Sequence, residues 1–154
     1  MHNCTTHNDC IADALERAEE ICTERDLRFT DVRRKVLELV WQSHGPIKAY
    51  DILDRLDQRI AAIKPPTVYR ALDFLTENGL VHKISSLNAF VGCGHPLKHR
   101  ECYFLICSDC GEAKECCNPD ITDVISKTSE RNEFLTDHVT LEITGECGDC
   151  RRTH

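Results

Sequence analysis

The sequence predicts an α+β chain in two parts: an N-terminal winged helix-turn-helix domain and a C-terminal α/β domain with a four-cysteine zinc site. Three observations lead to this prediction. Apolar residues recur at helical spacing up to about residue 78, a short hairpin pattern follows, and two Cys-x-x-Cys motifs stand beside strand-like segments further on. We expect the first domain over residues 1–85, a wing end and hinge over 86–94, and the second domain over 95–154.

Four amphipathic helices are expected in the first domain. On the first helix, Ile11, Leu15, Ala18 and Cys22 share one face. Thr30 is a suitable N-cap for the second helix, and Gly79 is suited to end the fourth as its C′ residue. The predicted spans are residues 9–26, from Thr30 to before His44, 48–60 and 67–78.

Strand patterns follow these helices. Residues 80–85 and 88–93 are short, rich in Val, Ile and Phe, and separated by polar residues, which indicates a β-hairpin. In the second domain, strands are expected over residues 103–107 and 139–144, on either side of a helix over 120–131. Helices followed by a hairpin make the winged arrangement of the first domain.

Composition limits the class of protein. The chain has 154 residues, a net charge of -7 and 41% hydrophobic residues, values typical of a globular domain. Its apolar runs, such as residues 36–41, are far shorter than the roughly 20 residues that cross a bilayer, and the N-terminus lacks the apolar core of a secretory signal. We therefore expect a cytoplasmic protein with no membrane partner. Its 11 Cys and 8 His then indicate metal ligands more than disulfides.

The two Cys-x-x-Cys motifs have the spacing of a structural zinc site. Cys107 and Cys110 form one pair, and Cys147 and Cys150 form the other. Two residues between thiolates allow one tight turn to direct both sulfurs at the same ion, and two such turns complete a tetrahedron. A redox dithiol or two unrelated turns are the alternatives.

A second, looser group of possible ligands lies in several segments: His82, Cys93, His95, His99 and Glu115. Nitrogen, sulfur and oxygen ligands from separate segments predict a site that tertiary structure assembles. The alternative is that His82 is a surface strand residue, Cys93 a buried small apolar residue and Glu115 a solvated charge.

The start of the predicted fourth helix is suited to DNA. Thr67, Tyr69 and Arg70 lie in its first turn, and the N-terminal turn of a recognition helix is the part that enters the major groove. The acidic total does not contradict this reading, because residues 1–84 carry 12 basic and 14 acidic side chains whereas residues 85–154 carry 7 and 12. Five basic residues also gather before and within the predicted second helix: Arg25, Arg28, Arg33, Arg34 and Lys35.

Four segments give the chain its resemblance to a known family: Lys64–Leu75, Gly79–Lys83, Asn88–Cys93 and Phe104–Gly111. With these motifs the chain resembles the ferric uptake regulator superfamily, and within it the zinc uptake regulators, over about residues 10–150. The resemblance implies a homodimeric, metal-gated transcriptional repressor and not an enzyme. It also implies that the C-terminal domain is the dimerisation domain.

The resemblance implies two Zn²⁺ ions per subunit. The structural ion maps onto Cys107, Cys110, Cys147 and Cys150. The regulatory ion maps onto His82, Cys93, His99 and Glu115, with His95 as a reserve ligand because His99 lies nearer to the next strand. Contacts to a palindromic double-stranded operator map onto Tyr50, Thr67, Tyr69 and Arg70. The resemblance also implies that the protein represses zinc uptake genes and that it has no small-molecule substrate.

Cys93 favours zinc over iron at the regulatory site, because a thiolate makes the ligand set softer than sets of His and carboxylate. An iron- or peroxide-responsive regulator of the same superfamily is the first alternative. A zinc-ribbon interaction module and a thiol oxidoreductase are less favoured. His138 is interpreted as a structural residue, although it resembles a position that binds metal in some relatives. The N-terminal cluster of His2, Cys4, His7 and Cys10 is interpreted as a frayed terminus with incidental metal affinity and not as a third site. Cys102, Cys116 and Cys117 have no assigned role.

Overall fold

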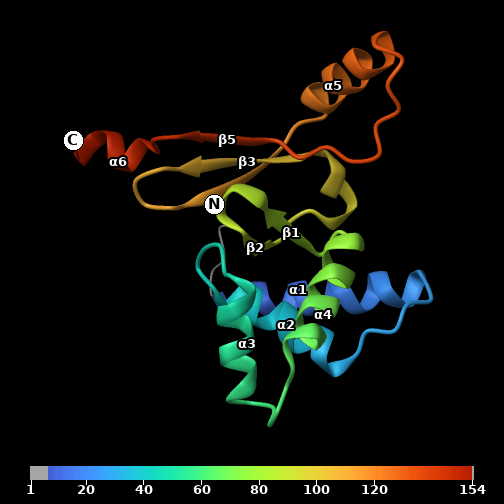
Figure 1. The fold of residues 1–154 in the computed structure, drawn as a ribbon, viewed down its shortest axis with the longest axis vertical. Helices are drawn as coiled ribbons and strands as arrows, with labels where there is room; N and C mark the ends of the chain where they lie inside the picture. The colour runs from blue at the N-terminus through green and yellow to red at the C-terminus, as the bar shows by residue number, and fades with distance from the viewer. Residues whose placement is uncertain (1–6, 154) are drawn as a thin grey trace. The chain divides into compact units, whose positions relative to one another are not determined.

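A computed structural model describes residues 7–153 (Figure 1). The chain divides between Pro96 and Leu97 into two compact units. Unit 1 holds four helices and a hairpin, with these bounds: α1 His7–Glu24, α2 Asp31–Gln42, α3 Ala49–Asp57, α4 Pro65–Glu77, β1 Val81–Ile84, η1 Ser85–Leu87 and β2 Ala89–Gly92. The observed α+β fold confirms the predicted class.

The helices of unit 1 surround one apolar core. Leu37, Leu39, Ile52, Leu72 and Leu75 are among its fully buried side chains and come from α2, α3 and α4. The first helix turns a slightly different face to this core than predicted. Its buried residues are Ala14, Ala18, Ile21 and Cys22, whereas the predicted Ile11 and Leu15 are only half-buried.

The two predicted capping residues, Thr30 and Gly79, have their expected roles, whereas α1 and α3 end two and three residues earlier than predicted. Thr30 is the N-cap of α2, and its hydroxyl accepts a hydrogen bond from the Arg33 N–H at 3.3 Å. At the end of α4, Gly79 takes a positive φ of 74°, and the Leu80 N–H donates to the Leu75 carbonyl at 2.9 Å. This is a Schellman ending, which a glycine accommodates without a Cβ clash. The start of α4 is two residues earlier than predicted, with Pro65 and Pro66 in its first turn.

The wing is an antiparallel hairpin fixed to the helical core. Val81 in β1 pairs with Gly92 in β2, and Ile84 pairs with Ala89. Ile47, just before α3, exchanges two backbone hydrogen bonds with Phe90 in β2. Trp41 of α2 packs so closely on Gly92 that a Cβ there would lie 2.4 Å from Cε2 of the indole.

Unit 2 is built on a three-stranded sheet. Its elements are η2 Pro96–Glu101, which crosses the boundary between the units, β3 Cys102–Cys107, β4 Ala113–Cys117, α5 Pro119–Arg131, β5 Glu142–Gly145 and α6 Gly148–Thr153. The sheet order is β4-β3-β5; β4 is antiparallel to β3, and β5 is parallel to it (Figure 1). Sequence reasoning missed β4, η2 and α6, and it placed the last strand about three residues too early.

Unit 2 buries few side chains. Of its described residues, Phe104, Ile106 and Cys107 are the buried apolar ones, and α5 has none. Large apolar side chains remain exposed on it, including Leu105, Val124, Phe134, Leu135 and Ile143. No helix within residues 7–153 has the length and apolar character to span a membrane.

Candidate metal centre and nucleic-acid interface

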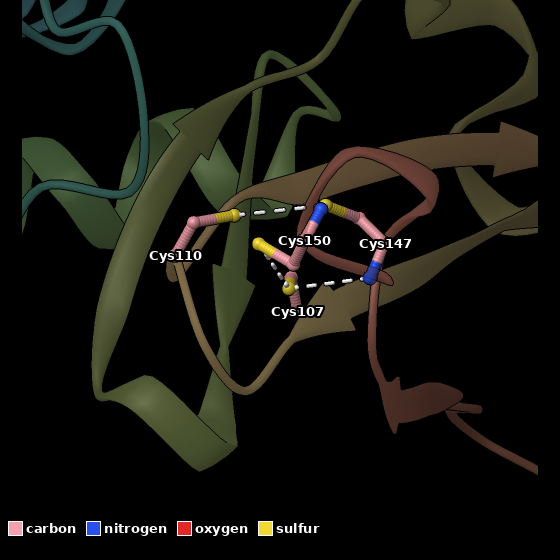
Figure 2. Close-up of side chains that lie close together, drawn as sticks. All are labelled: Cys107, Cys110, Cys147 and Cys150. Atoms are coloured by element: carbon pink, nitrogen blue, oxygen red, sulfur yellow. Dashed lines mark hydrogen bonds between the residues drawn. The ribbon is translucent and has the colours of Figure 1, made fainter. Parts of the chain in front are cut away.

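The four cysteines of the two motifs meet at one end of the unit 2 sheet. Cys107 is the last residue of β3, and Cys147 follows β5 by two residues. Because β3 and β5 are parallel neighbours, both strands end on the same side, and the turns that follow them come together. Figure 2 shows the side chains of Cys107, Cys110, Cys147 and Cys150 converging from these two turns.

The spacing of the four sulfurs fits a tetrahedral ion. All four sulfurs lie within 4.8 Å of one another, with 3.8 Å between Cys107 and Cys150 and 3.9 Å between Cys110 and Cys147 (Figure 2). A tetrahedral zinc with Zn–S bonds of about 2.3 Å places its sulfurs about 3.8 Å apart. These four residues therefore have both the chemistry and the spacing to hold zinc.

Backbone hydrogen bonds support the turns of this cluster. Gly111, with φ 72°, donates its N–H to the Cys107 carbonyl at 3.0 Å and closes the first turn. The Cys147 N–H donates to the Cys107 sulfur at 3.3 Å, and the Ser108 N–H donates to the Gly145 carbonyl at 2.8 Å. The two turns are thus joined by a backbone hydrogen bond as well as by contacts of their sulfur atoms.

Backbone N–H groups also prepare one sulfur of the cluster for a metal. N–H groups of Cys110, Cys147 and Asp109 stabilise the Cys107 thiolate and lower the pKa of this thiol to about 6. The pKa of Cys150 is raised, chiefly by its hydrogen bond with the Cys147 thiol. The lowered pKa favours the thiolate form of Cys107, which is the form that binds metal.

Two of the predicted regulatory ligands lie at the base of the wing. His82 is in β1 opposite Val91, and Cys93 follows β2, where its N–H donates to the Leu80 carbonyl at 3.0 Å. His82 is 7% exposed and Cys93 2% exposed, so the reading of His82 as a surface strand residue is wrong. Arg17 of α1, which sequence reasoning did not single out, donates to the Gly94 carbonyl at 3.2 Å and anchors the segment beside Cys93.

The other candidate ligands follow in the sequence. His95 is exposed, whereas His99, in η2, is half-buried. Glu115 lies in β4 opposite Phe104 and is half-buried. The difference in exposure favours His99 over His95 as a ligand.

A cysteine pair with no predicted role lies beside Glu115 in the same sheet. Cys102 begins β3 and Cys117 ends β4; the two residues pair across the strands and form a disulfide. The sulfur of Cys117 lies 3.7 Å from a carboxylate oxygen of Glu115. The sequence alone did not reveal this pair, because β4 was not predicted and the partners are 15 residues apart.

The predicted DNA-contacting residues are all exposed. Thr67, Tyr69 and Arg70 lie in the first turns of α4, and Tyr50 is the second residue of α3. Tyr50 is 75% exposed and Tyr69 53% exposed, so neither ring packs into the core of unit 1. These exposed side chains are therefore accessible for contacts with the bases and phosphates of DNA.

The basic cluster around α2 is partly engaged within the protein. Arg25 donates a hydrogen bond to the Asn78 carbonyl. The guanidinium carbon of Arg33 lies 3.6 Å from the centroid of the Phe74 ring. Arg34 forms an ion pair with Glu19, with 2.7 Å between nitrogen and oxygen. These contacts position the arginines on the surface of unit 1 and leave fewer of their N–H groups for phosphate.

The remaining predictions concern His138 and the N-terminal residues. His138 is exposed and its Nε2 lies 3.0 Å from the Thr140 hydroxyl. The His7 ring stacks on His44 with 4.5 Å between centroids. His2 and Cys4 lie outside the described residues.

The chain is similar to known regulatory proteins over most of its length. The family model for the ferric uptake regulator family matches residues 24–144. The zinc uptake regulation protein of Escherichia coli (strain K12) is 42% identical over 139 residues, which cover 88% of this chain and 80% of that protein. The peroxide operon regulator of Bacillus subtilis (strain 168) is 30% identical over 146 residues, 92% of this chain and 96% of that protein.

A solved structure agrees with this relationship. The structure of a zinc uptake regulator complexed with zinc and DNA superposes with a TM-score of 0.87 and 38% identity, covering 93% of this chain and 96% of that one. Together with the family match across residues 24–144, this likeness shows that the chain belongs to the ferric uptake regulator family.

Proposed function

We propose that this protein is a zinc-responsive transcriptional repressor, which binds operator DNA as a zinc-loaded homodimer and represses zinc uptake genes in the cytoplasm. The observation that carries the proposal is its similarity, over most of both chains, to a zinc uptake regulator whose structure contains zinc and DNA. The ligand chemistry supports the same reading, and no enzymatic step is required of any residue.

Zinc is proposed to occupy two sites per subunit. Cys107, Cys110, Cys147 and Cys150 would hold the structural ion, which adds folding free energy to a unit with a small buried core. His82, Cys93, His99 and Glu115 would hold the regulatory ion.

The residues of the regulatory set favour zinc over iron. Cys93 is 2% exposed at the base of the wing and would contribute a thiolate. A thiolate beside imidazole and carboxylate ligands suits zinc better than Fe(II) or Mn(II), which prefer harder nitrogen and oxygen ligands. The similarity to a peroxide operon regulator keeps an iron- or peroxide-responsive regulator as the second candidate.

DNA contact is assigned to Tyr50, Thr67, Tyr69 and Arg70. The first turn of α4 would enter the major groove, where Arg70 can donate to guanine and Thr67 to phosphate. The exposed rings of Tyr50 and Tyr69 are suited to contact thymine methyl groups or the sugar-phosphate backbone. A palindromic operator matches a two-fold symmetric dimer, because each subunit then meets an equivalent half-site.

The exposed apolar residues of unit 2 support a homodimer. Leu105 and Ile143 are directly paired across β3 and β5, and they are 39% and 45% exposed. Adjacent apolar side chains on one face of a sheet favour coverage by another protein surface. A second copy of the same unit is the partner that the family relationship supports.

The direct test is a DNA-binding titration of the structurally intact dimer with and without the second zinc. We expect the second equivalent of zinc to tighten operator binding roughly 5- to 150-fold, the range of common coupling energies. Iron(II) in place of zinc should give less tightening. Equal operator affinity with one and two zinc ions per chain would exclude the proposal, and a stronger response to iron would favour the second candidate.

A further inference from the structure

We propose that Cys102 and Cys117 form a reversible dithiol–disulfide pair that adjusts the zinc affinity of the regulatory site. This inference rests on the proposed function, because it assigns a second input to the site that contains His99 and Glu115. It uses two cysteines that have no part in either proposed zinc site.

The pairing of β3 with β4 places the two sulfurs together. Cys102 and Cys117 are directly opposite each other, with Cα atoms 4.1 Å apart. The adjacent hydrogen bond from the Asn118 N–H to the Glu101 carbonyl, at 3.1 Å, makes them a non-hydrogen-bonded pair, in which opposite side chains come closest. The sheet register therefore places the two cysteines where a disulfide can form between them.

Each sulfur also touches a segment that carries a proposed regulatory ligand. The sulfur of Cys117 lies 3.7 Å from a Glu115 carboxylate oxygen, and that of Cys102 lies 3.2 Å from the carbonyl oxygen of Lys98, the residue before His99. Both neighbours are oxygen acceptors. As thiols, the two cysteines can donate hydrogen bonds to these oxygens, whereas a disulfide has no proton to donate.

These contacts give the direction of the effect. Hydrogen bonds to a metal-binding carboxylate orient it, and loss of such outer contacts lowers metal affinity by about 10- to 100-fold. The reduced pair would therefore support Glu115 and the segment of His99, and oxidation would remove both supports. The oxidised protein should bind regulatory zinc more weakly. It should therefore need a higher zinc concentration to stay bound to DNA.

The oxidant is a low-molecular-weight disulfide such as glutathione disulfide. One cysteine thiolate attacks a glutathione sulfur and expels a glutathione thiolate, which leaves a mixed disulfide on the protein. The second cysteine thiolate then attacks the protein sulfur of that bond and expels the other glutathione. Two protein thiols and one glutathione disulfide thus become one protein disulfide and two glutathione molecules. In a reducing compartment such a bond is transient, as a regulatory pair requires.

The test uses the full-length dimer in buffers rich in either reduced glutathione or glutathione disulfide. Mass spectrometry of digested protein identifies the linked peptides, and chelator competition measures the affinity for the second zinc. We expect a 102–117 link in the oxidising buffer and about 10- to 100-fold weaker second-site zinc binding. The first zinc should be retained in both buffers.

Three variants test whether the redox response comes from Cys102 and Cys117 and not from other thiols. Cys117→Ser keeps a hydroxyl donor beside Glu115 but cannot form the disulfide, so its zinc affinity should stay near that of the reduced protein in both buffers. Cys102→Ser should also lose the response. Cys116→Ser is the matched control, because this free thiol is the strand neighbour of Cys117 and should leave the response intact.

Thermodynamic linkage gives an independent measurement. If oxidation weakens zinc binding, saturation with zinc must make the 102–117 disulfide harder to form by the same factor. Equal zinc affinity of the wild-type dimer in the two buffers, or a redox response that survives in Cys102→Ser, would overturn the inference. Failure of zinc to tighten DNA binding even in the reduced protein would instead count against the proposed function.

Discussion

Arg70 is the side chain in the first turns of α4 whose chemistry best suits base recognition. It is exposed, and its guanidinium can donate two hydrogen bonds to one guanine. We expect Arg70→Ala to weaken binding to the operator by about 1–3 kcal/mol and to relax the preference at one base pair of each half-site. Fluorescence anisotropy with zinc-loaded protein at fixed salt measures both effects.

The matched control for this change is Arg131→Ala, which also removes an exposed arginine but lies at the end of α5 in unit 2. It should leave operator affinity nearly unchanged. Equal losses in the two variants would mean that Arg70 contributes only general positive charge.

Cys93 is predicted to determine the second zinc but not the first. Cys93→Ser replaces a thiolate with a neutral hydroxyl, a poor zinc ligand, so bound zinc should fall from two ions to one per chain. Metal analysis after dialysis measures this ratio. Testing His99→Ala and His95→Ala in parallel should show loss of the second ion in the first variant alone; the opposite result would make His95 the ligand.

The meeting of the four motif cysteines was predictable from sequence, because each Cys-x-x-Cys pair needs only one local turn. The parallel pairing of β3 with β5 brings the two turns together. The pairing of Cys102 with Cys117 depends instead on the register of a strand that the sequence did not reveal. A charged Lys114-Glu115 step interrupts the apolar pattern of that strand.

At the scale of elements, the contact between α2 and the wing has no room for added volume at Gly92. A Cβ at Gly92 would lie 2.4 Å from the Trp41 ring, so the indole or β2 must move. We expect Gly92→Ala to lower the free energy of unfolding by about 1–3 kcal/mol, as overpacking commonly does. Denaturant unfolding followed by circular dichroism measures the loss.

Gly45→Ala is the matched control, because a Cβ there would meet no atom within 4 Å. It should change the free energy of unfolding by much less than Gly92→Ala. If the two substitutions cost the same, the close packing of Trp41 on the wing is not what limits stability.

Helices were more predictable than strands because their signals are local. Thr30, Gly79 and the apolar spacing located the helices of unit 1 to within a few residues. The parallel strand β5 begins later than expected because its pairing with β3 decides where it starts; the Phe104 N–H bonds the Leu141 carbonyl, and the ladder continues to Gly145. Such long-range pairing has no signature within a short window of sequence.

At the scale of the whole molecule, assembly is predicted to depend on the exposed apolar face of unit 2. Ile143→Asp places a charge beside Leu105 on this face. A second subunit that covers this face would remove water from the charge, and this cost should weaken the dimer. Sedimentation velocity should show a shift from dimer to monomer at micromolar concentration. Ser126→Asp, an exposed change on α5, is the control and should remain dimeric.

Removal of the proposed structural zinc is predicted to affect the two units unequally. Unit 2 has a small buried core, so loss of the ion from the four cysteines should open it while the larger core of unit 1 stays folded. Hydrogen exchange with mass spectrometry, before and after strong chelation, should show faster exchange in β3 and β5 and unchanged exchange in α2 and α4. Uniform acceleration would mean that the units unfold together.

Trp41 also gives the molecule a built-in optical probe. It is the single tryptophan of the chain, and its indole rests on Gly92, the residue before Cys93. Occupation of the regulatory site should therefore change the intensity or wavelength of its emission. The four cysteines proposed to hold the structural ion belong to unit 2, whereas Trp41 belongs to unit 1. We therefore expect a fluorescence titration to respond to the regulatory zinc more than to the structural zinc, without a label.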